Sequence, residues 1–278
     1  MKPVAFDMAR PQTVAEALAL LAENADAKLL AGGQSLVPVM NFRLLAPGLL
    51  IDLNRISSLS GIELQGERLD IGAMTRQADV LAHPLVARHA PLLAKAVPHI
   101  GHVQTRSRGT IGGSLAHADA SAELPLVMVA LDAQLTLQSR NAERSVAARA
   151  FFTDAMTTVL AADELLTRVS IPVAPQGART GFRELARRHG DFAIVAVAAQ
   201  YAPPHLAVAV GGLEAVPRLC AGLVAELAQC GFARDRLGDL VRAELADAQP
   251  LSDLQADGEY RRRLAEVLLE RTLEDVLG

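Results

Sequence analysis

The segment Lys28-Leu-Leu-Ala-Gly-Gly-Gln-Ser-Leu-Val-Pro-Val-Met40 carries the clearest structural signal in the chain. The apolar run 27–30 predicts a short buried strand, the adjacent glycines predict a loop, and residues 36–44 predict a short helix. A second pair of glycines lies in Thr110-Ile-Gly-Gly-Ser114. Because glycine permits positive φ and close approach, successive N–H groups in such a loop can converge on an anion, and a following helix adds its own free N–H groups. The two loops therefore form a candidate site for a diphosphate.

Each loop by itself is weak evidence, since a single Gly-Gly pair is more often only a tight turn. The sequence contains neither the GxxxxGK[ST] motif of P-loop triphosphatases nor the GxGxxG motif of Rossmann dinucleotide sites. A ligand site is favoured by the pairing of the two loops and by the residues that surround each of them.

Around the first loop, the sequence predicts an alternation of helix and strand. Thr13-x-x-Glu16 has the form of a capping box, and Val14, Leu18 and Leu21 recur at helical spacing. Residues 49–52 then predict another strand, which completes a strand–loop–helix–strand unit of α/β type.

From residue 61 onward, the pattern predicts a second region of strands and helices and then an antiparallel region. The expected strands are 61–64, 69–72, 134–138, 164–171, 180–185, 193–199 and 206–210, and the expected helices are 76–82, 89–97, 124–131 and most of 222–277. The stretch 172–178, rich in Pro and Gly, is expected to link the last region to the others.

Composition narrows the class of protein. With 278 residues, of which 51% are hydrophobic, the chain is long enough for two or three domains with aliphatic cores. A net charge of -4 without a basic block argues against a nucleic-acid surface. The N-terminal residues lack the apolar core of a signal peptide, and no run of about 18 apolar residues occurs, so we expect a cytoplasmic protein without a transmembrane segment.

The cysteines and histidines do not form a metal-binding pattern. Cys220 and Cys230 fit neither a zinc site nor a CxxC redox pair, and two thiols cannot hold an iron–sulfur cluster alone. We expect them to be reduced and mostly structural. The histidines at 83, 89, 99, 102, 189 and 205 show no metal-ligand spacing, so no metal site is expected.

Both glycine loops and their flanks resemble one family. Residues 28–40, Arg108-Gly-Thr-Ile-Gly-Gly-Ser-Leu-Ala-His-Ala-Asp119 and Glu123-Leu-Pro125 look like the flavin-carrying medium subunit of carbon monoxide dehydrogenase and of other xanthine dehydrogenase-like molybdenum hydroxylases. Phe182-Arg-Glu-Leu-Ala-Arg-Arg-His-Gly-Asp-Phe-Ala-Ile-Val195 resembles the start of that family's C-terminal domain. The similarity covers essentially the whole chain.

The resemblance implies an α+β protein. A FAD-binding domain of the p-cresol methylhydroxylase type, made of two α/β subdomains, would be followed by a small C-terminal domain with a three-stranded antiparallel sheet and helices. We place the first subdomain at residues 1–57, the second at 58–174 and the C-terminal domain at 175–278. The diphosphate of a non-covalently held FAD is expected between the two loops, and the C-terminal domain is expected to cover the flavin.

The resemblance also assigns roles to the residues of both loops. On one side of the diphosphate, the expected donors are the backbone N–H groups of Ala31, Gly32, Gly33, Gln34 and Ser35. On the other side, the residues expected to bind the diphosphate and approach the ribityl chain are Thr110, Ile111, Gly112, Gly113 and Ser114. Lys28 and Leu29, with Leu30 beside them, match positions that line the adenosine portion.

Further cofactor residues follow from the same match. Ile100 matches a position that packs against the cofactor. Glu123 matches an acidic residue that binds polyol or ribose hydroxyls, which suits a carboxylate because it can accept two protons; Asp119 is a second candidate. Leu166 and Arg183 match positions near the isoalloxazine ring, where a cation would stabilise the reduced flavin.

Phe192 and His117 each have two possible interpretations. Phe192, beside Asp191, is a candidate for the aromatic side chain that lies over the flavin in relatives, or an ordinary core residue. His117 either contacts the flavin or its diphosphate, or has a structural role. A covalent bond from a histidine to FAD is not expected, because this family typically holds FAD without one.

The resemblance implies an electron relay. The chain has too few cysteines for [2Fe–2S] clusters and too little length for a molybdopterin domain. We therefore expect an oxidoreductase subunit whose FAD takes electrons from a [2Fe–2S] small subunit and passes them to an external acceptor, while a molybdopterin large subunit hydroxylates the substrate. The implied assembly is a dimer of heterotrimers. No catalytic acid, base or nucleophile is expected in this chain.

Two other functions stay open at this point. A free-standing flavin oxidase or reductase would need its own substrate pocket, for which a C-terminal region of about 100 residues is small. A non-catalytic assembly subunit would have a decayed flavin site, which the intact glycines at 32, 33, 112 and 113 argue against.

Overall fold

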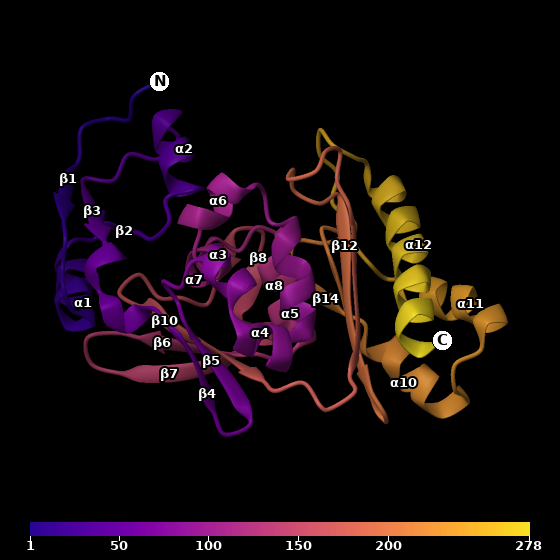
Figure 1. Cartoon of the computed structure of the whole chain (residues 1–278). Coiled ribbons are helices and arrows are strands. Elements are labelled where there is room, and N and C mark those ends of the chain that lie inside the picture. Colours follow the sequence, from indigo (N-terminus) through magenta and orange to yellow (C-terminus); the bar gives the residue numbers. More distant parts are fainter.

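The computed structural model describes all 278 residues and shows three parts that follow one another along the chain (Figure 1). The N-terminal part and the C-terminal part lie at opposite ends, and a central part lies between them. None of the helices is both long enough and apolar enough to cross a lipid bilayer.

A small parallel sheet forms the N-terminal part. In spatial order its strands are β1 (Asp7–Ala9), β3 (Leu49–Asp52) and β2 (Lys28–Leu30), and its helices are α1 (Val14–Glu23), α2 (Leu36–Asn41) and the short 3-10 turns η1 (Leu53–Arg55) and η2 (Ser57–Leu59). The capping box is confirmed, because the hydroxyl of Thr13 accepts a hydrogen bond from the N–H of Glu16. Strand β1 was not predicted, since three residues are too few for a periodic signal.

The central part is a five-stranded antiparallel sheet covered on one face by helices. In spatial order the strands are β4 (Ile62–Gln65), β5 (Arg68–Gly72), β10 (Leu165–Pro172), β6 (Gln134–Gln138) and β7 (Glu143–Ala147). The other elements are α3 (Gln77–Ala82), α4 (Pro84–His89), α5 (Pro91–Ala96), η3 (Val97–His99), α6 (Val103–Arg108), α7 (Ile111–His117), α8 (Glu123–Ala130), α9 (Ala148–Phe151), β8 (Phe152–Asp154) and β9 (Thr157–Thr158). Helix α8 is buried along its whole length, which explains why its sequence has no polar face.

The C-terminal part is an antiparallel sheet with helices on its outer face. Its strands are β11 (Arg179–Leu185), β12 (Val195–Ala202), β13 (His205–Gly211) and β14 (Arg218–Leu219), and its helices are α10 (Ala221–Cys230), α11 (Arg234–Glu244) and α12 (Gly258–Leu277). The sheet has four strands and not the three predicted. The fourth, β14, pairs only two residues with β13, which is too short to show a strand pattern in the sequence.

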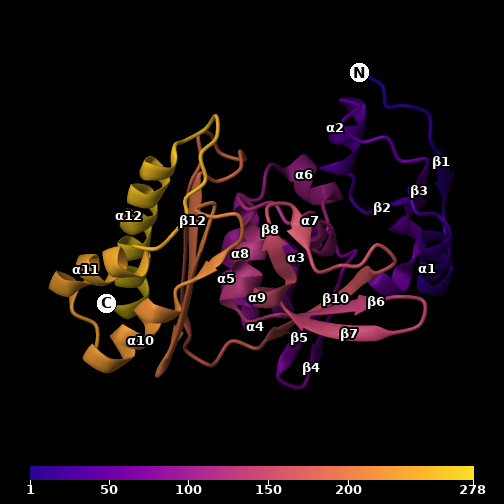
Figure 2. The ribbon, with the colours of Figure 1, turned by 180° about the vertical axis from the view of Figure 1, so that it is seen from behind.

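The C-terminal sheet lies between two layers of helices (Figure 1, Figure 2). Helix α12 packs against one face, and α5 and α8 of the central part pack against the other. The side chains of β12 alternate accordingly: Ala196 and Ala198 join the core of the central part, whereas Val195 and Val197 lie in the core under α12. The small alanines let the sheet come close to α8, so the two parts share one interface.

A buried arginine ties α12 to the sheet. The guanidinium of Arg261 donates to the carbonyl oxygens of Ile194 and Gly212, at 2.5 and 2.7 Å, and to Asp253 at 2.7 Å, and its side chain is 1% exposed. Arg261 is the only side chain that donates to these two carbonyl groups. It therefore stabilises the packing of α12 against the sheet.

We expect Arg261→Met to lower the free energy of unfolding by about 3 kcal/mol, because it leaves buried carbonyl groups without a donor. Urea denaturation of the full chain measures this. Arg263→Met, on the same helix but 59% exposed and paired only with Glu259, is the matched control and should change the value by less than about 1 kcal/mol. Equal effects of the two substitutions would contradict the assignment.

Candidate functional site

The first glycine loop contains a run of backbone N–H groups that have no partner inside the chain. From Ala31 to Leu36 no N–H group donates a hydrogen bond to the protein, and the next one, of Val37, donates to the carbonyl of Gly33 at 3.1 Å. Gly33 has a φ of 74°, a left-handed value at which successive N–H groups can converge. Because successive unpaired N–H groups can converge on an anion, this run is a candidate anion-binding site.

The second glycine stretch is the first turn of a helix. Helix α7 begins at Ile111, and its N-cap residue Thr110 accepts a hydrogen bond from the N–H of Gly113 at 3.0 Å. The N–H groups of Ile111 and Gly112 donate at 3.1 and 2.8 Å to carbonyl oxygens of the segment 73–75. The role of this stretch at the diphosphate stays a prediction. Only the N–H of Thr110 has no partner in the chain, because tertiary and helical hydrogen bonds use the others.

The two glycine stretches meet at their backbones. A Cβ atom added to Gly32 would lie 2.3 Å from the carbonyl oxygen of Arg108, and one added to Gly113 would lie 3.3 Å from the Cβ of Ala31. A side chain at position 32 would therefore force the N-terminal and central parts apart. Glycine at this position is required by the contact between the two segments as well as by any ligand.

Two residues that the sequence did not single out, Asn54 and Arg76, bridge the same two segments. Asn54 Nδ2 donates to the carbonyl of Ala31 at 3.1 Å, and Asn54 Oδ1 accepts from Arg76 Nη2 at 2.6 Å. Arg76 Nη1 in turn donates to the carbonyl of Arg108. Burial, followed by the charge of Arg108, lowers the pKa of Arg76. These contacts hold the first loop against the start of α7, and no local sequence signal marks them because their partners are far apart in the chain.

Ionisable side chains gather where the central part meets the C-terminal part. Glu123, the first residue of α8, is 3% exposed, and its carboxyl group is hydrogen-bonded only to its own backbone. Burial raises the pKa of this carboxyl to about 7. Across the interface, Glu184 Oε1 lies 3.0 Å from His99 Nδ1, while Glu184 Oε2 is buried without a partner. The cluster therefore leaves Glu184 Oε2 without a partner and the Glu123 carboxyl group without a side-chain partner, so both can accept from a polar ligand.

Several predicted cofactor residues lie beside these two places. Ile100 is buried and follows His99 directly, and Asp119 acts on the pKa of Glu123 through its charge. Leu166 is buried in the core under the central sheet. Lys28, Leu29 and Leu30 form strand β2, which leads into the first loop; Lys28 is exposed and the leucines are half-buried.

Arg183 lies on the other face of the C-terminal sheet. Along β11, Phe182 and Glu184 face the central part, so the side chain between them points to α12. There Arg183 Nη2 donates to Asp275 Oδ2 at 2.7 Å. The structure therefore places Arg183 on the opposite face of the sheet from Glu123, and a contact of Arg183 with the flavin stays a prediction.

The loop between β11 and β12 exposes Asp191 and Phe192. Because 48% of Phe192 is exposed, the interpretation of this residue as an ordinary core residue is wrong. Gly190 lies against His102, so the loop contacts the segment that follows Ile100. His117, the last residue of α7, is half-buried, and its contact with the cofactor stays a prediction.

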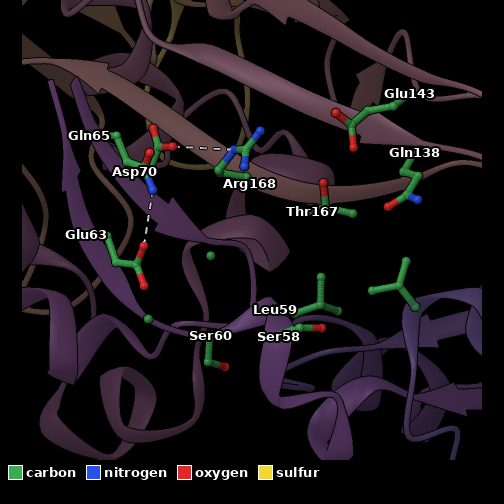
Figure 3. Close-up of a pocket in the computed structure, with 13 residues that line it drawn as sticks. Ser58, Leu59, Ser60, Glu63, Gln65, Asp70, Gln138, Glu143, Thr167 and Arg168 are labelled. Atoms are coloured by element: carbon green, nitrogen blue, oxygen red, sulfur yellow. Dashed lines mark hydrogen bonds and ion pairs between the residues drawn. The ribbon is translucent and has the colours of Figure 1, made fainter. Parts of the chain in front are cut away.

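A polar hollow of about 320 Å³ lies apart from the predicted residues, none of which lines it (Figure 3). Arg168 and Asp70 face each other there with their nearest N and O atoms 3.7 Å apart, and Gln65 Nε2 donates to Glu63 Oε2 at 3.3 Å. No group of three or more His, Cys, Asp or Glu side chains in the structure is arranged to hold a metal ion.

Comparison with known proteins places this geometry in a family. Residues 4–174 match the family described as "FAD binding domain in molybdopterin dehydrogenase", and residues 180–276 match "CO dehydrogenase flavoprotein C-terminal domain". The chain is 36% identical to the 6-hydroxypseudooxynicotine dehydrogenase complex subunit alpha of Paenarthrobacter nicotinovorans, over 100% of this chain and 96% of the relative. It is 34% identical to the carbon monoxide dehydrogenase medium chain of Hydrogenophaga pseudoflava, over 98% of this chain and 97% of that protein.

Solved structures agree with these matches. A chain of carbon monoxide dehydrogenase from Hydrogenophaga pseudoflava superposes with a TM-score of 0.96 at 34% identity, covering 99% of this chain and 98% of the other. A chain of quinoline 2-oxidoreductase from Pseudomonas putida 86 gives a TM-score of 0.94 at 34% identity, covering 100% and 98%. Both the fold class and the resemblance drawn from the sequence are confirmed.

The residues of the structure fit FAD. The run of free N–H groups from Ala31 to Leu36 suits the two negative charges of a diphosphate. The backbone contact at Gly32 leaves no side chain between the two segments. The carboxyl group of Glu123, which has no side-chain partner, and the unpartnered Oε2 of Glu184 suit hydroxyl or N–H donors of the cofactor.

Replacement of Gly32 by alanine should abolish FAD binding, because the added methyl group would clash with the carbonyl of Arg108 and displace the loop. The flavin absorbance of the purified full chain measures the bound fraction, which we expect to fall at least about tenfold. Gly66→Asn is the matched control, since position 66 has open space and a φ of 59° that asparagine tolerates. Retention of FAD by Gly32→Ala would refute the role of the close contact.

Glu123→Gln should stabilise the chain without FAD at high pH. The pKa of Glu123 is about 7 in the folded chain, above its ordinary value in the unfolded chain. The protonated carboxyl group therefore favours the folded state below the ordinary pKa, and this contribution to the free energy of unfolding is lost as pH rises through about 7. At pH 8 the variant should therefore gain about 3 kcal/mol in the free energy of unfolding over the wild type, and little at pH 4. The same variant should bind FAD more weakly. A variant that is less stable than the wild type at pH 8 would show that the carboxylate has a structural role.

Proposed function

This chain belongs to the family of FAD-binding subunits of carbon monoxide dehydrogenase-type molybdenum hydroxylases, and we propose that it serves as the electron-transfer subunit of such an enzyme. The observation that carries the proposal is the run of free N–H groups from Ala31 to Leu36, facing a second segment that Gly32 brings into contact. A subunit with a decayed flavin site would not be expected to keep unpaired donors in this arrangement.

FAD, when bound, can take up electrons singly and release them as a pair, which suits it to link iron–sulfur clusters with a two-electron acceptor. The residues of this chain have other tasks. The first loop binds the diphosphate, while Asn54 and Arg76 keep that loop against α7. Glu123 orients the cofactor by accepting from its hydroxyl groups. The C-terminal sheet covers the flavin and excludes water from it.

The electrons in this proposal come from a [2Fe–2S] small subunit, and substrate oxidation takes place in a molybdopterin large subunit. The relatives support this division, since they are described as a medium chain or as one subunit of a dehydrogenase complex. This chain has two cysteines, Cys220 and Cys230, whereas a [2Fe–2S] cluster held by thiolates needs four. The assembly we propose is a dimer of heterotrimers in the cytoplasm.

The test uses the complex that copurifies with the full chain. With wild-type chain, substrate should bleach the flavin absorbance and reduce an external acceptor. With Gly32→Ala, substrate should still reduce the iron–sulfur centres of the partner, but transfer to a two-electron acceptor should fall at least about a hundredfold, because the route through FAD is missing. Full acceptor reduction without flavin, or a chain that copurifies with no partner, would refute the proposal.

A further inference from the structure

A histidine at the boundary between the central and C-terminal parts, His99, acts on Glu123 through its charge. His99 ends η3 in the central part, and its Nδ1 lies 3.0 Å from Glu184 on β11 of the C-terminal part. Of the cationic side chains, His99 alone acts on the pKa of Glu123. Since Glu123 and Ile100 are residues assigned to the cofactor, the imidazole lies at the wall of the same site.

Contacts of its ring and of the backbone around it hold His99 in position. The ring of His99 lies against Phe182, with ring centroids 4.9 Å apart, and 38% of the side chain is exposed. The guanidinium of Arg106 donates to the carbonyl oxygens of Pro98, Ile100 and Gly101 at 3.1, 2.9 and 3.0 Å, so the backbone around His99 is held in place. The imidazole is thus bound at Nδ1 and partly exposed, so it can face a ligand.

The other charged groups around the pair do not replace the imidazole. Arg183 points to Asp275 on the far face of the sheet. Lys95 of α5 donates to the carbonyl of Thr180, and Arg106 of α6 is engaged with backbone carbonyls. The charged groups that remain are the carboxyl groups of Glu184 and Glu123, which act on the pKa of His99, and of Asp119, which acts on the pKa of Glu123.

We propose that His99, held by Glu184, presents the positive charge that stabilises the reduced flavin, a role that the sequence assigned to Arg183. The inference rests on the proposed function, because it needs FAD in this site. The flavin ring gains negative charge on reduction, and a cation at the wall of its pocket lowers the free energy of that state relative to the oxidised one.

The effect depends on pH with a defined sign. The hydrogen bond to Glu184 is the largest cause that raises the pKa of His99, so the imidazolium persists to higher pH than that of a free histidine. The positive charge is present below this pKa and is lost as pH rises through it. The potential of the flavin should therefore decrease more steeply with pH in that range than outside it.

Titration of the flavin potential across pH, with the FAD-loaded full chain, tests the inference. His99→Gln keeps a hydrogen-bond donor to Glu184 but carries no charge. It should have a more negative potential than wild type below the pKa of His99, and the two should converge above it. His99→Lys should keep the less negative potential into the alkaline range. Glu184→Gln should move the steep region to lower pH, because the imidazolium loses its partner.

His102→Gln is the matched control. This nearby histidine stacks on His189, with ring centroids 5.9 Å apart, and does not contact Glu184, so its substitution should leave the potential profile unchanged. Identical profiles for His99→Gln and wild type would overturn the inference, as would variants of His99 that lose thermal stability without any change in potential. A wild-type chain that binds no FAD would overturn the proposed function as well, so the two failures can be told apart.

Discussion

The contact between Gly32 and the carbonyl of Arg108 is the constraint on which the site depends. There is no space for a side chain between these two backbones, so the N-terminal and central parts meet directly at this point. The contact presents the free N–H groups that begin at Ala31 to the start of α7. Asn54 and Arg76 reinforce it with side-chain hydrogen bonds to the same two segments. A diphosphate held here would therefore be bound by backbone whose position the fold determines.

The two glycine stretches differ because their N–H groups have different partners. In the first stretch, positive φ at Gly33 keeps the donors out of regular structure. In the second, Thr110 caps a helix and the segment 73–75 takes up further donors, so the stretch is rigid before any ligand binds. The small residues at 112 and 113 serve this packing, since a Cβ atom on Gly112 would lie 2.5 Å from the Cβ of Ala73. One stretch thus supplies donors and the other supplies a fixed surface.

Structural features that depend on neighbouring residues in the chain could be predicted from the sequence. Features that depend on tertiary contacts could not. The strand, loop and helix around Gly32 follow from hydrophobic pattern and glycine placement within a dozen residues. The pairing of His99 with Glu184 joins segments that are far apart in the chain, so no spacing rule reveals it. The orientation of Arg183 could not be predicted either, because a strand with helices on both faces buries both sets of alternate side chains. The helical start of α7 was missed because glycines at 112 and 113 argue against helix by propensity, while tertiary hydrogen bonds of residues 111 and 112 override it.

The distribution of charge in the site follows the charge of the cofactor. The diphosphate keeps the same charge throughout a redox cycle, and neutral N–H groups in fixed positions are sufficient to hold it. The flavin changes its charge on reduction, and in our proposal the titratable pair of His99 and Glu184 lies beside it. Unpaired donors in the loop and a buried carboxyl both reduce the stability of the chain without FAD. In the proposed function, binding of FAD would supply partners for both and would stabilise the chain through mass action, so the cofactor would contribute to the fold as well as to electron transfer.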